Sequence, residues 1–249
     1  VKRSARDLAG YLSKIIGNEF FVKTGDGKSG IAIGSISDFP NIPFKPSFSV
    51  MHPGESQGYE IKTHSRGIYI IGATPQAVDY AVFDFLQRLG YRRYFPMDKW
   101  EIIPRKKNLF FNLHVREVPD YYSRWIWSYY GLWPEYKSSF NEWNRINRNG
   151  GYVLNTGHSY EQFIRMNKKI FEKHPEYLGL VNGKRKSTKF CISNPSLRKL
   201  IVDSVVKRFQ HFPKLNSVSV DPSDGGGWCE CEKCRNLGSP STRAVFLAN

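Results

Sequence analysis

Four cysteines offer the most specific chemistry in the sequence. Cys229, Cys231 and Cys234 form a C-x-C-x-x-C motif, and Cys191 is the only other cysteine. Cys191 follows the strand expected before this motif, so a parallel arrangement would bring all four to one edge. Four thiolates could bind a structural zinc ion, and two disulfides are the alternative in an exported chain. We favour zinc and leave disulfides open.

Two aspartates lie just before this motif, in the segment VDPSDGGG. Asp221 and Asp224 follow a short alternating strand expected at residues 217–220. The proline between them favours a turn, and the glycines let the backbone approach a ligand closely. Carboxylates at the end of a strand could perform acid–base chemistry or bind sugar hydroxyls. Alternatively, they are turn residues that cap backbone N–H groups.

A histidine and an aromatic segment could contact a sugar. His158 follows the strand expected at residues 152–156, where an imidazole could donate to a sugar hydroxyl or transfer a proton. A loop histidine bonded to the backbone is the alternative. Residues 121–143 are rich in Trp and Tyr, whose faces stack on the apolar faces of sugars. Core packing is the other use of such rings.

The elements that must position these residues begin with a small α+β module. Apolar spacing predicts a helix over residues 5–16, and strands are expected at residues 20–24 and 30–36. Two alternating runs that meet at Ser65–Gly67 predict a hairpin. Thr74 has the type and position of an N-cap for a helix that follows it. We expect this domain to cover residues 1–118.

From residue 119 onward, expected strands alternate with helices expected over residues 160–174 and 196–212, and a third strand region is expected within residues 176–195. This alternation predicts parallel βα units. About four units fit before Asn249, whereas a closed (β/α)8 barrel needs about 250 residues. The predicted fold class is therefore α/β, with residues 119–249 forming the first half of a TIM-type barrel. Functional residues in such barrels follow the carboxyl ends of the strands. This rule adds Arg124, Trp127 and Trp228 to the candidate sugar-binding residues.

Composition restricts the classes of function. The 249 residues are 40% hydrophobic, and no apolar run approaches the roughly 18–20 residues that a membrane helix needs. The formal net charge of +15 could indicate nucleic-acid binding, but the dense basic runs at residues 103–108 and 182–189 are expected in loops. No nucleic-acid motif accompanies them. We expect no nucleic-acid partner and no membrane span.

The ordered motifs of the chain resemble a bacterial family, domain of unknown function 4838, part of which is glycoside hydrolase family 163. The resemblance rests on AVDYAVFDFLQRLGYRRYFP, WEIIP, NRINRNGG, TGHSY, HPEYLGLVNGKR, CISNP and VDPSDGGGWCECEKC, which occur in the family's order. Residues 1–118 are also similar to the small domain that precedes the barrel in α-glucuronidases and β-hexosaminidases.

This resemblance implies a secreted, cell-surface or periplasmic β-N-acetylglucosaminidase-type glycosidase that acts on glycans such as N-glycans. Related hexosaminidases retain configuration by using the substrate's own acetamido group as nucleophile, and this chemistry requires no cofactor. Asp224 is the first candidate for the site carboxylate and Asp221 the second, although the adjacent Asp–Glu pair of hexosaminidases is absent. By the same resemblance, His158 and Arg124 are candidate sugar contacts.

Two other classes of function compete with a glycosidase. A non-catalytic carbohydrate-binding protein of the same fold is the main alternative, and a zinc-stabilised nucleic-acid-binding module is the third. Because the later barrel strands lie outside residues 1–249, we expect this stretch alone to have negligible turnover. The sequence does not indicate an oligomeric state.

Overall fold

The computed structural model describes residues 1–44, 46–126, 128 and 133–249, which form two compact units. The first unit is Val1–Tyr152 and the second is Val153–Asn249. Both combine helices with small sheets, so a mixed α/β fold is confirmed, and no sheet among the described residues closes into a barrel. The expected boundary at residue 118 falls inside the first compact unit.

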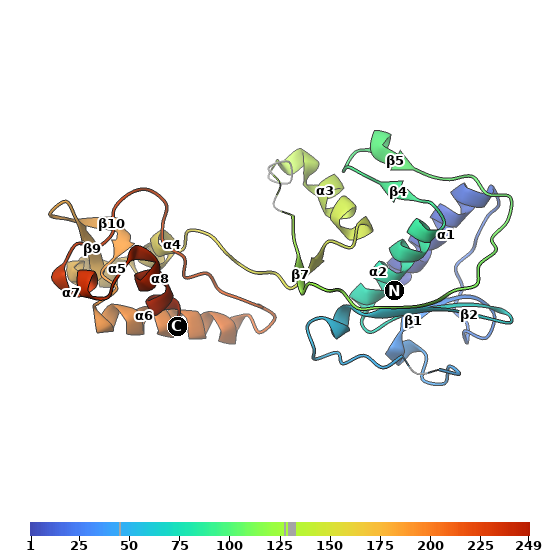
Figure 1. Ribbon diagram of the computed structural model, residues 1–249, viewed down its shortest axis with the longest axis horizontal. Coiled ribbons are helices and arrows are strands. Elements are labelled where there is room, and N and C mark those ends of the chain that lie inside the picture. Colours follow the sequence, from blue (N-terminus) through green and yellow to red (C-terminus); the bar gives the residue numbers. More distant parts are fainter. Residues whose placement is uncertain (45, 127, 129–132) are drawn as a thin grey trace. The chain divides into compact units, whose positions relative to one another are not determined.

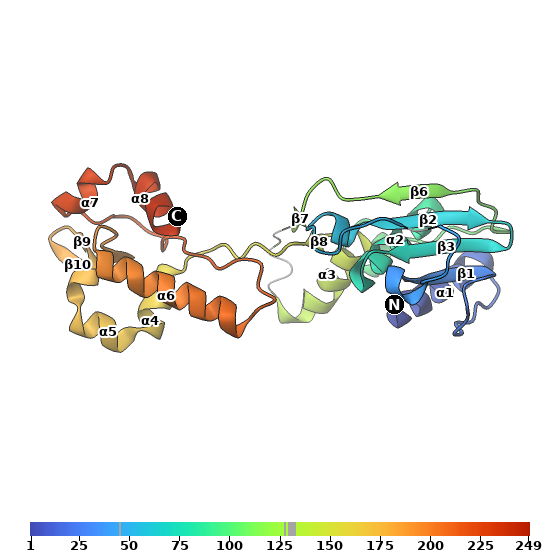
Figure 2. The ribbon, with the colours of Figure 1, turned by 90° about the horizontal axis from the view of Figure 1, so that it is seen from below.

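A four-stranded mixed sheet forms the centre of the first unit. Its strand order is β1 (Gly30–Ser35), β3 (Gly67–Gly72), β2 (Tyr59–His64) and β6 (His114–Glu117), as Figure 2 shows. β1 is parallel to β3, whereas β2 is antiparallel to both β3 and β6. The hairpin predicted at Ser65–Gly67 is therefore confirmed. The strand predicted at residues 20–24 is wrong: these residues form no strand, and the Phe21 ring is 82% exposed.

Two helices cover one face of this sheet (Figure 1). α1 (Lys2–Ile16) buries Leu8, Leu12 and Ile15. In α2 (Pro75–Arg88), nine residues are buried, so this helix forms the centre of the apolar core. The side chain of Thr74 accepts the backbone N–H of Ala77, as predicted for an N-cap.

The remainder of the first unit is attached to these helices. Its regular elements are β4 (Arg92–Arg93), β5 (Glu101–Ile102), β7 (Ser123–Arg124), β8 (Gly150–Gly151) and α3 (Pro134–Ile146). Short 3-10 helices cover Ile36–Asp38, Glu55–Gln57 and Asp98–Trp100. Arg145 of α3 forms ion pairs with Asp7 of α1 and Asp79 of α2. These contacts explain why residues beyond 118 belong to the first compact unit.

In the second unit, helices surround one antiparallel hairpin. Its elements are α4 (Tyr160–Met166), α5 (Lys168–Lys173), a 3-10 helix at Pro175–Tyr177, β9 (Leu178–Val181), β10 (Lys184–Phe190), α6 (Pro195–His211), α7 (Glu232–Asn236) and α8 (Pro240–Ala248). β9 and β10 pair antiparallel through a turn at Asn182–Gly183, where both residues have positive φ. This hairpin lies where the sequence predicted a third parallel strand region.

The other two predicted strands of this region do not form: residues 152–156 and 217–220 are not in a strand. Just after each segment, His158 and Asp221 pair in one isolated parallel bridge. The helix predicted over residues 160–174 is divided into α4 and α5 at Asn167. α6 is confirmed, and the Asn194 side chain accepts the N–H groups of Ser196 and Leu197 at its start.

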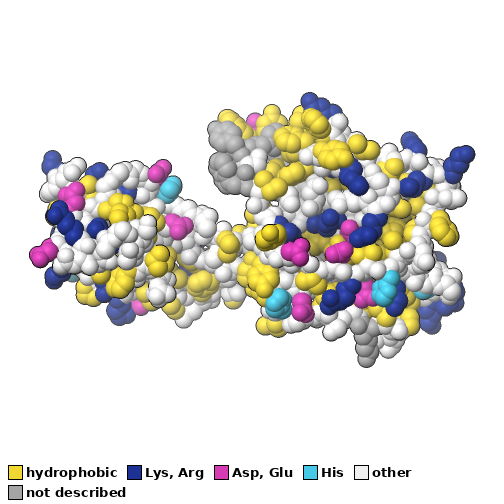
Figure 3. Space-filling view, viewed as in Figure 1, with side chains coloured by type: hydrophobic (Ala, Val, Ile, Leu, Met, Phe, Trp, Pro, Cys, Tyr) yellow, Lys and Arg dark blue, Asp and Glu magenta, His cyan; other side chains and the backbone are white. Residues whose placement is uncertain are grey.

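Two surface properties bear on function. Within the described part of the chain, every helix is too short or too polar to span a bilayer. On the face drawn in Figure 3, Lys and Arg side chains lie singly or in small groups among acidic and apolar side chains. The positive charge on that face is therefore dispersed.

The end of β3 packs tightly against the first turn of α2, which predicts the effect of a small substitution. A Cβ atom at Gly72 would lie 2.4 Å from the backbone nitrogen of Val78. We expect Gly72→Ala to destabilise the protein by about 1–3 kcal/mol, because backbone atoms must move. At Gly10 of α1 no atom lies within 4 Å of an added Cβ. The control Gly10→Ala should therefore stabilise it by roughly 0.5–1 kcal/mol. Urea unfolding measures both, and equal stabilities would contradict this packing.

Candidate functional site

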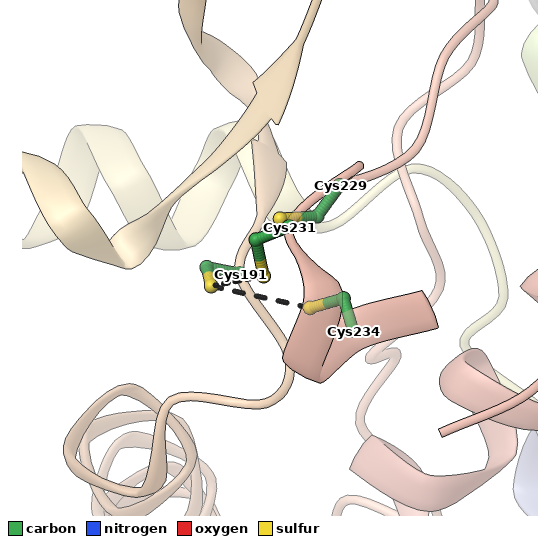
Figure 4. A group of neighbouring side chains, drawn as sticks. All are labelled: Cys191, Cys229, Cys231 and Cys234. Carbon is green, nitrogen blue, oxygen red and sulfur yellow. Dashed lines mark hydrogen bonds between the residues drawn. The ribbon is translucent and has the colours of Figure 1, made fainter. Parts of the chain in front are cut away.

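Four cysteines from two segments of the second unit converge on one point. Cys191 follows β10, Cys229 and Cys231 precede α7, and Cys234 lies within α7; Figure 4 shows their side chains pointing toward one another. All four sulfur atoms lie within 4.8 Å of one another. Cys231 is partly exposed, and the other three are buried. The structure thus brings Cys191 together with the C-x-C-x-x-C motif.

The distances in this cluster do not fit disulfide bonds. The Sγ atom of Cys191 lies 3.7 Å from that of Cys231 and 3.9 Å from that of Cys234. A disulfide requires an S–S distance of about 2.05 Å. All four cysteines are free, and their sulfur atoms could together hold a metal ion.

Backbone N–H groups point at the sulfur atoms. Leu180 of β9 donates to Cys229 Sγ at 3.4 Å, and Ser193 donates to Cys234 Sγ at 3.3 Å. The hydroxyl oxygen of Ser193 lies 3.1 Å from Cys234 Sγ. Hydrogen bonds from N–H groups favour the charged form of an acceptor. These donors from the β9–β10 hairpin and from the loop after it therefore stabilise thiolates in the cluster.

The sulfur atoms nevertheless cannot all ionise without a cation. Hydrogen bonds from Cys191 and Cys229 lower the pKa of Cys234. The hydrogen bonds that Cys191 makes to Cys229 and Cys234, together with burial, raise the pKa of the Cys191 thiol. One thiolate is stabilised at the expense of its neighbours, because like charges at this separation repel. A bound metal ion would remove this conflict.

The acidic segment, residues 220–227, begins where two segments of the chain meet. Asp221 forms the parallel bridge with His158, and its backbone oxygen accepts the N–H group of Ser159 at 3.1 Å. The carboxylate of Asp221 accepts the N–H group of Gly157 at 2.8 Å and lies 2.8 Å from Ser219 Oγ. Asp221 therefore fixes these two segments to each other.

Asp224 is placed differently. Its side chain is 89% exposed, and its Oδ2 atom lies 3.9 Å from Nε2 of His158, which is 62% exposed. The other ring nitrogen of His158 lies 3.1 Å from the carbonyl oxygen of Pro222, which can only accept, so Nδ1 carries the proton. The Nε2 atom of the same ring faces the Asp224 carboxylate.

A pocket and a buried phenol lie beside this pair. His158 contributes to a pocket of about 320 Å³ whose other polar residues include Asn155, Gln162 and Arg208; neither Asp221 nor Asp224 lines it. Tyr160 follows two residues later, and within the described part of the chain its buried hydroxyl has no hydrogen-bond partner. Burial and then the charge of Asp221 raise the pKa of this phenol, which keeps it neutral.

The remaining predicted residues lie elsewhere. Trp228 is partly buried and packs against the apolar core of the second unit. Arg124 belongs to β7 in the first unit, where it donates to the carbonyl oxygens of Tyr121 and Arg148 and to Gln57 Oε1. Trp127 lies outside the described residues.

Several residues of this region were not singled out from the sequence. Lys189 donates to the backbone of the acidic segment, and Ser219 lies 2.6 Å from the carbonyl oxygen of Gly157. The guanidinium of Arg243, which is buried, donates to the carbonyl oxygen of Cys229 at 2.9 Å. Lys and Arg are rarely buried, and no pattern of spacing marks these two as exceptions.

The fold and the cysteine cluster define a mixed α/β protein with a candidate metal centre beside the acidic segment. A family model described as domain of unknown function (DUF4838) matches residues 95–246, more than half of the chain. The chain belongs to this family, as its motifs indicated. No match was found among curated proteins.

The state of the cysteines gives a direct prediction. When the protein is denatured without reductant and with a chelator present, all four free cysteines should react with a thiol reagent. The closest sulfur distances exceed the roughly 2.05 Å of a disulfide. A reduced sample sets the maximum signal. Reaction of two cysteines or none would show that disulfides form and contradict this arrangement.

Proposed function

We propose that this chain is part of a glycoside hydrolase, of the family 163 type, that acts on N-acetylglucosamine-containing glycans. In this proposal, residues 119–249 are the first half of a (β/α)8 barrel. Residues 1–118 correspond to the small domain of α-glucuronidases and β-hexosaminidases. Membership of the DUF4838 family is consistent with it. The protein would act outside the cytoplasm, on the cell surface, in the periplasm or after secretion.

The single observation that carries the proposal is the parallel bridge between His158 and Asp221. The segments that it joins are connected through α4, α5, the β9–β10 hairpin and α6, and a parallel pair with a crossover that contains helices is the unit from which such barrels are built. In barrels of this kind, catalytic groups follow the ends of neighbouring strands. His158, Asp221 and Asp224 have that relation to the bridge.

The contacts suggest different roles for the two aspartates. In substrate-assisted hydrolysis, the acetamido oxygen attacks the anomeric carbon, an acid protonates the leaving oxygen, and a carboxylate orients the acetamido N–H. Asp224 is exposed and faces His158, so we assign it the contact with the sugar. Asp221 is occupied by Gly157 and Ser219, so we assign it a positioning role.

This division predicts different effects of the two amide variants. In the full-length protein, Asp224→Asn should lower kcat/KM on a complex N-glycan by about 10²–10⁴-fold, the usual contribution of a general acid or base. Its melting temperature should not change, because the side chain is 89% exposed. Asp221→Asn should lower the melting temperature as well as the activity.

Three outcomes would count against the proposal. Unchanged turnover of Asp224→Asn would remove this carboxylate from the mechanism. Glycan binding without cleavage by the intact protein would favour a non-catalytic carbohydrate-binding protein. Salt-sensitive binding to DNA or heparin without glycan binding would favour a nucleic-acid-binding module.

We also propose that the four cysteines bind a structural zinc ion. Sulfur ligands at about 2.3 Å from zinc in a tetrahedron lie about 3.8 Å from one another. The distances of 3.7 and 3.9 Å from Cys191 are close to this value. Four protein ligands leave no open coordination position, so zinc would stabilise the second unit and take no part in hydrolysis.

The environment of the sulfur atoms supports this proposal. A zinc ion with four thiolates carries net negative charge, which a buried cation can balance. Arg243 contacts Cys229 and Gly238 through their carbonyl oxygens, and among the described residues it has no acidic partner within ion-pair distance. Its guanidinium is therefore available to balance the charge of the centre.

Zinc binding can be tested without any activity. The full-length protein should contain about one equivalent of zinc, and Cys231→Ser should lose it, because the site needs four thiolates. Ser193→Ala keeps all four sulfur atoms and the backbone donor, so this control should keep its zinc. Affinity should fall as the pH is lowered, because protons compete for the thiolates. Absence of zinc at neutral pH under reducing conditions would contradict the proposal.

A further inference from the structure

Lys189 is a buried cation that the proposed reaction does not use. It lies near the end of β10, and its side chain is 4% exposed. Among the described residues, no carboxylate lies within ion-pair distance of its ammonium. A buried charge is costly unless it is paired or fully hydrogen-bonded. A buried lysine at this position must therefore be stabilised by contacts with nearby groups.

The ammonium group is fully occupied by the acidic segment. Its Nζ atom donates to three successive carbonyl oxygens, those of Ser223 at 2.6 Å, Asp224 at 3.2 Å and Gly225 at 2.8 Å. An ammonium has three N–H donors, so none remains for a ligand. Lys189 can therefore fix the backbone of this turn but cannot donate a proton to a substrate.

The turn is also held at Ser223, whose Oγ accepts the N–H group of Glu161 at 3.2 Å, but an added Cβ at Gly225 or Gly226 would meet no atom within 4 Å. Three glycines, Gly225–Gly227, follow Asp224, and two of them have positive φ, which only glycine adopts readily. Glycine loses the most conformational freedom on folding and has no side chain to pack. The exposed Asp224 side chain accepts the N–H group of the adjacent Gly225 at 2.8 Å, a local contact that does not tie the turn to the rest of the unit.

We propose that Lys189 is the positioning residue for Asp224. Its ammonium takes the place that a bound cation would have at three converging carbonyl oxygens. It holds the turn so that the Asp224 carboxylate faces Nε2 of His158 across 3.9 Å. This inference extends the proposed glycosidase site, and the sugar-binding role of Asp224 depends on that function. The contact between Lys189 and the turn does not.

Hydrogen exchange tests the contact without any substrate. In the full-length protein, Lys189→Met keeps the length of the side chain but removes the three donors. We expect backbone amides of residues 223–228 to exchange at least about tenfold faster, because local opening of this turn becomes easier. Amides of α6 should be unaffected. Lys186→Met removes the same charge from an exposed position on β10 and serves as the control.

Turnover tests the consequence for the site. If the protein cleaves a complex N-glycan, Lys189→Met should lower kcat by at least about tenfold with little change in KM, because a misplaced carboxylate impairs the chemical step. Lys189→Arg keeps a cation with several donors and should restore part of kcat. Lys186→Met should behave as the wild type.

The outcomes separate this inference from the proposed function. Without turnover on any glycan the glycosidase proposal fails, while exchange still decides the role of Lys189. Unchanged exchange at residues 223–228 in Lys189→Met would overturn the inference. Faster exchange throughout the second unit would also overturn it, because Lys189 would then stabilise the whole unit. If Lys189→Met does not fold, Lys189→Gln, which keeps an N–H donor without the charge, is measured instead and should show intermediate exchange at the turn.

Discussion

The close approach of four sulfur atoms is the constraint on which the second unit depends. The atoms come from the end of the β9–β10 hairpin and from the segment around α7, which are separated by α6 in the chain. Neutral thiols would contribute modest packing, and unscreened thiolates would repel. The N–H donors from Leu180 and Ser193 and the guanidinium of Arg243 all favour negative charge here. These groups fit a metal–thiolate centre better than a thiol cluster.

The acidic segment lies beside this cluster, and the same part of the chain holds both. The turn is bound by Lys189 on one side and continues into Cys229 on the other. Lys189 is only two residues from Cys191, so one short segment of β10 and its loop holds both features. The aspartate that faces His158 is thus connected to the rigid part of the unit, although its own segment has no regular secondary structure.

Periodicity predicted the elements that rest on a broad apolar face. α1, α2, α6 and the β2–β3 hairpin were predicted because apolar spacing, caps and turn residues agree there. The strand expected at residues 20–24 is absent: Phe20 packs against the core of the first unit, whereas Phe21 is exposed. The β9–β10 hairpin was missed because Asn182–Gly183, a hairpin turn signal, was interpreted within a parallel βα scheme. The convergence of the cysteines could be predicted because they follow neighbouring expected strands in the chain. No sequence pattern marks Lys189 and Arg243 as buried.

A metal ion bound by the four cysteines would have an effect beyond the native contacts. It would close a loop that contains α6 and the long stretch before Cys229, and this stretch forms no helix or strand. Closing a loop of this kind removes many conformations from the unfolded chain. The entropic cost of bringing the two ends of the loop together grows only slowly with the number of residues in it. A metal that stays attached while the rest opens would therefore keep the ends of this loop together and favour the return to the native fold.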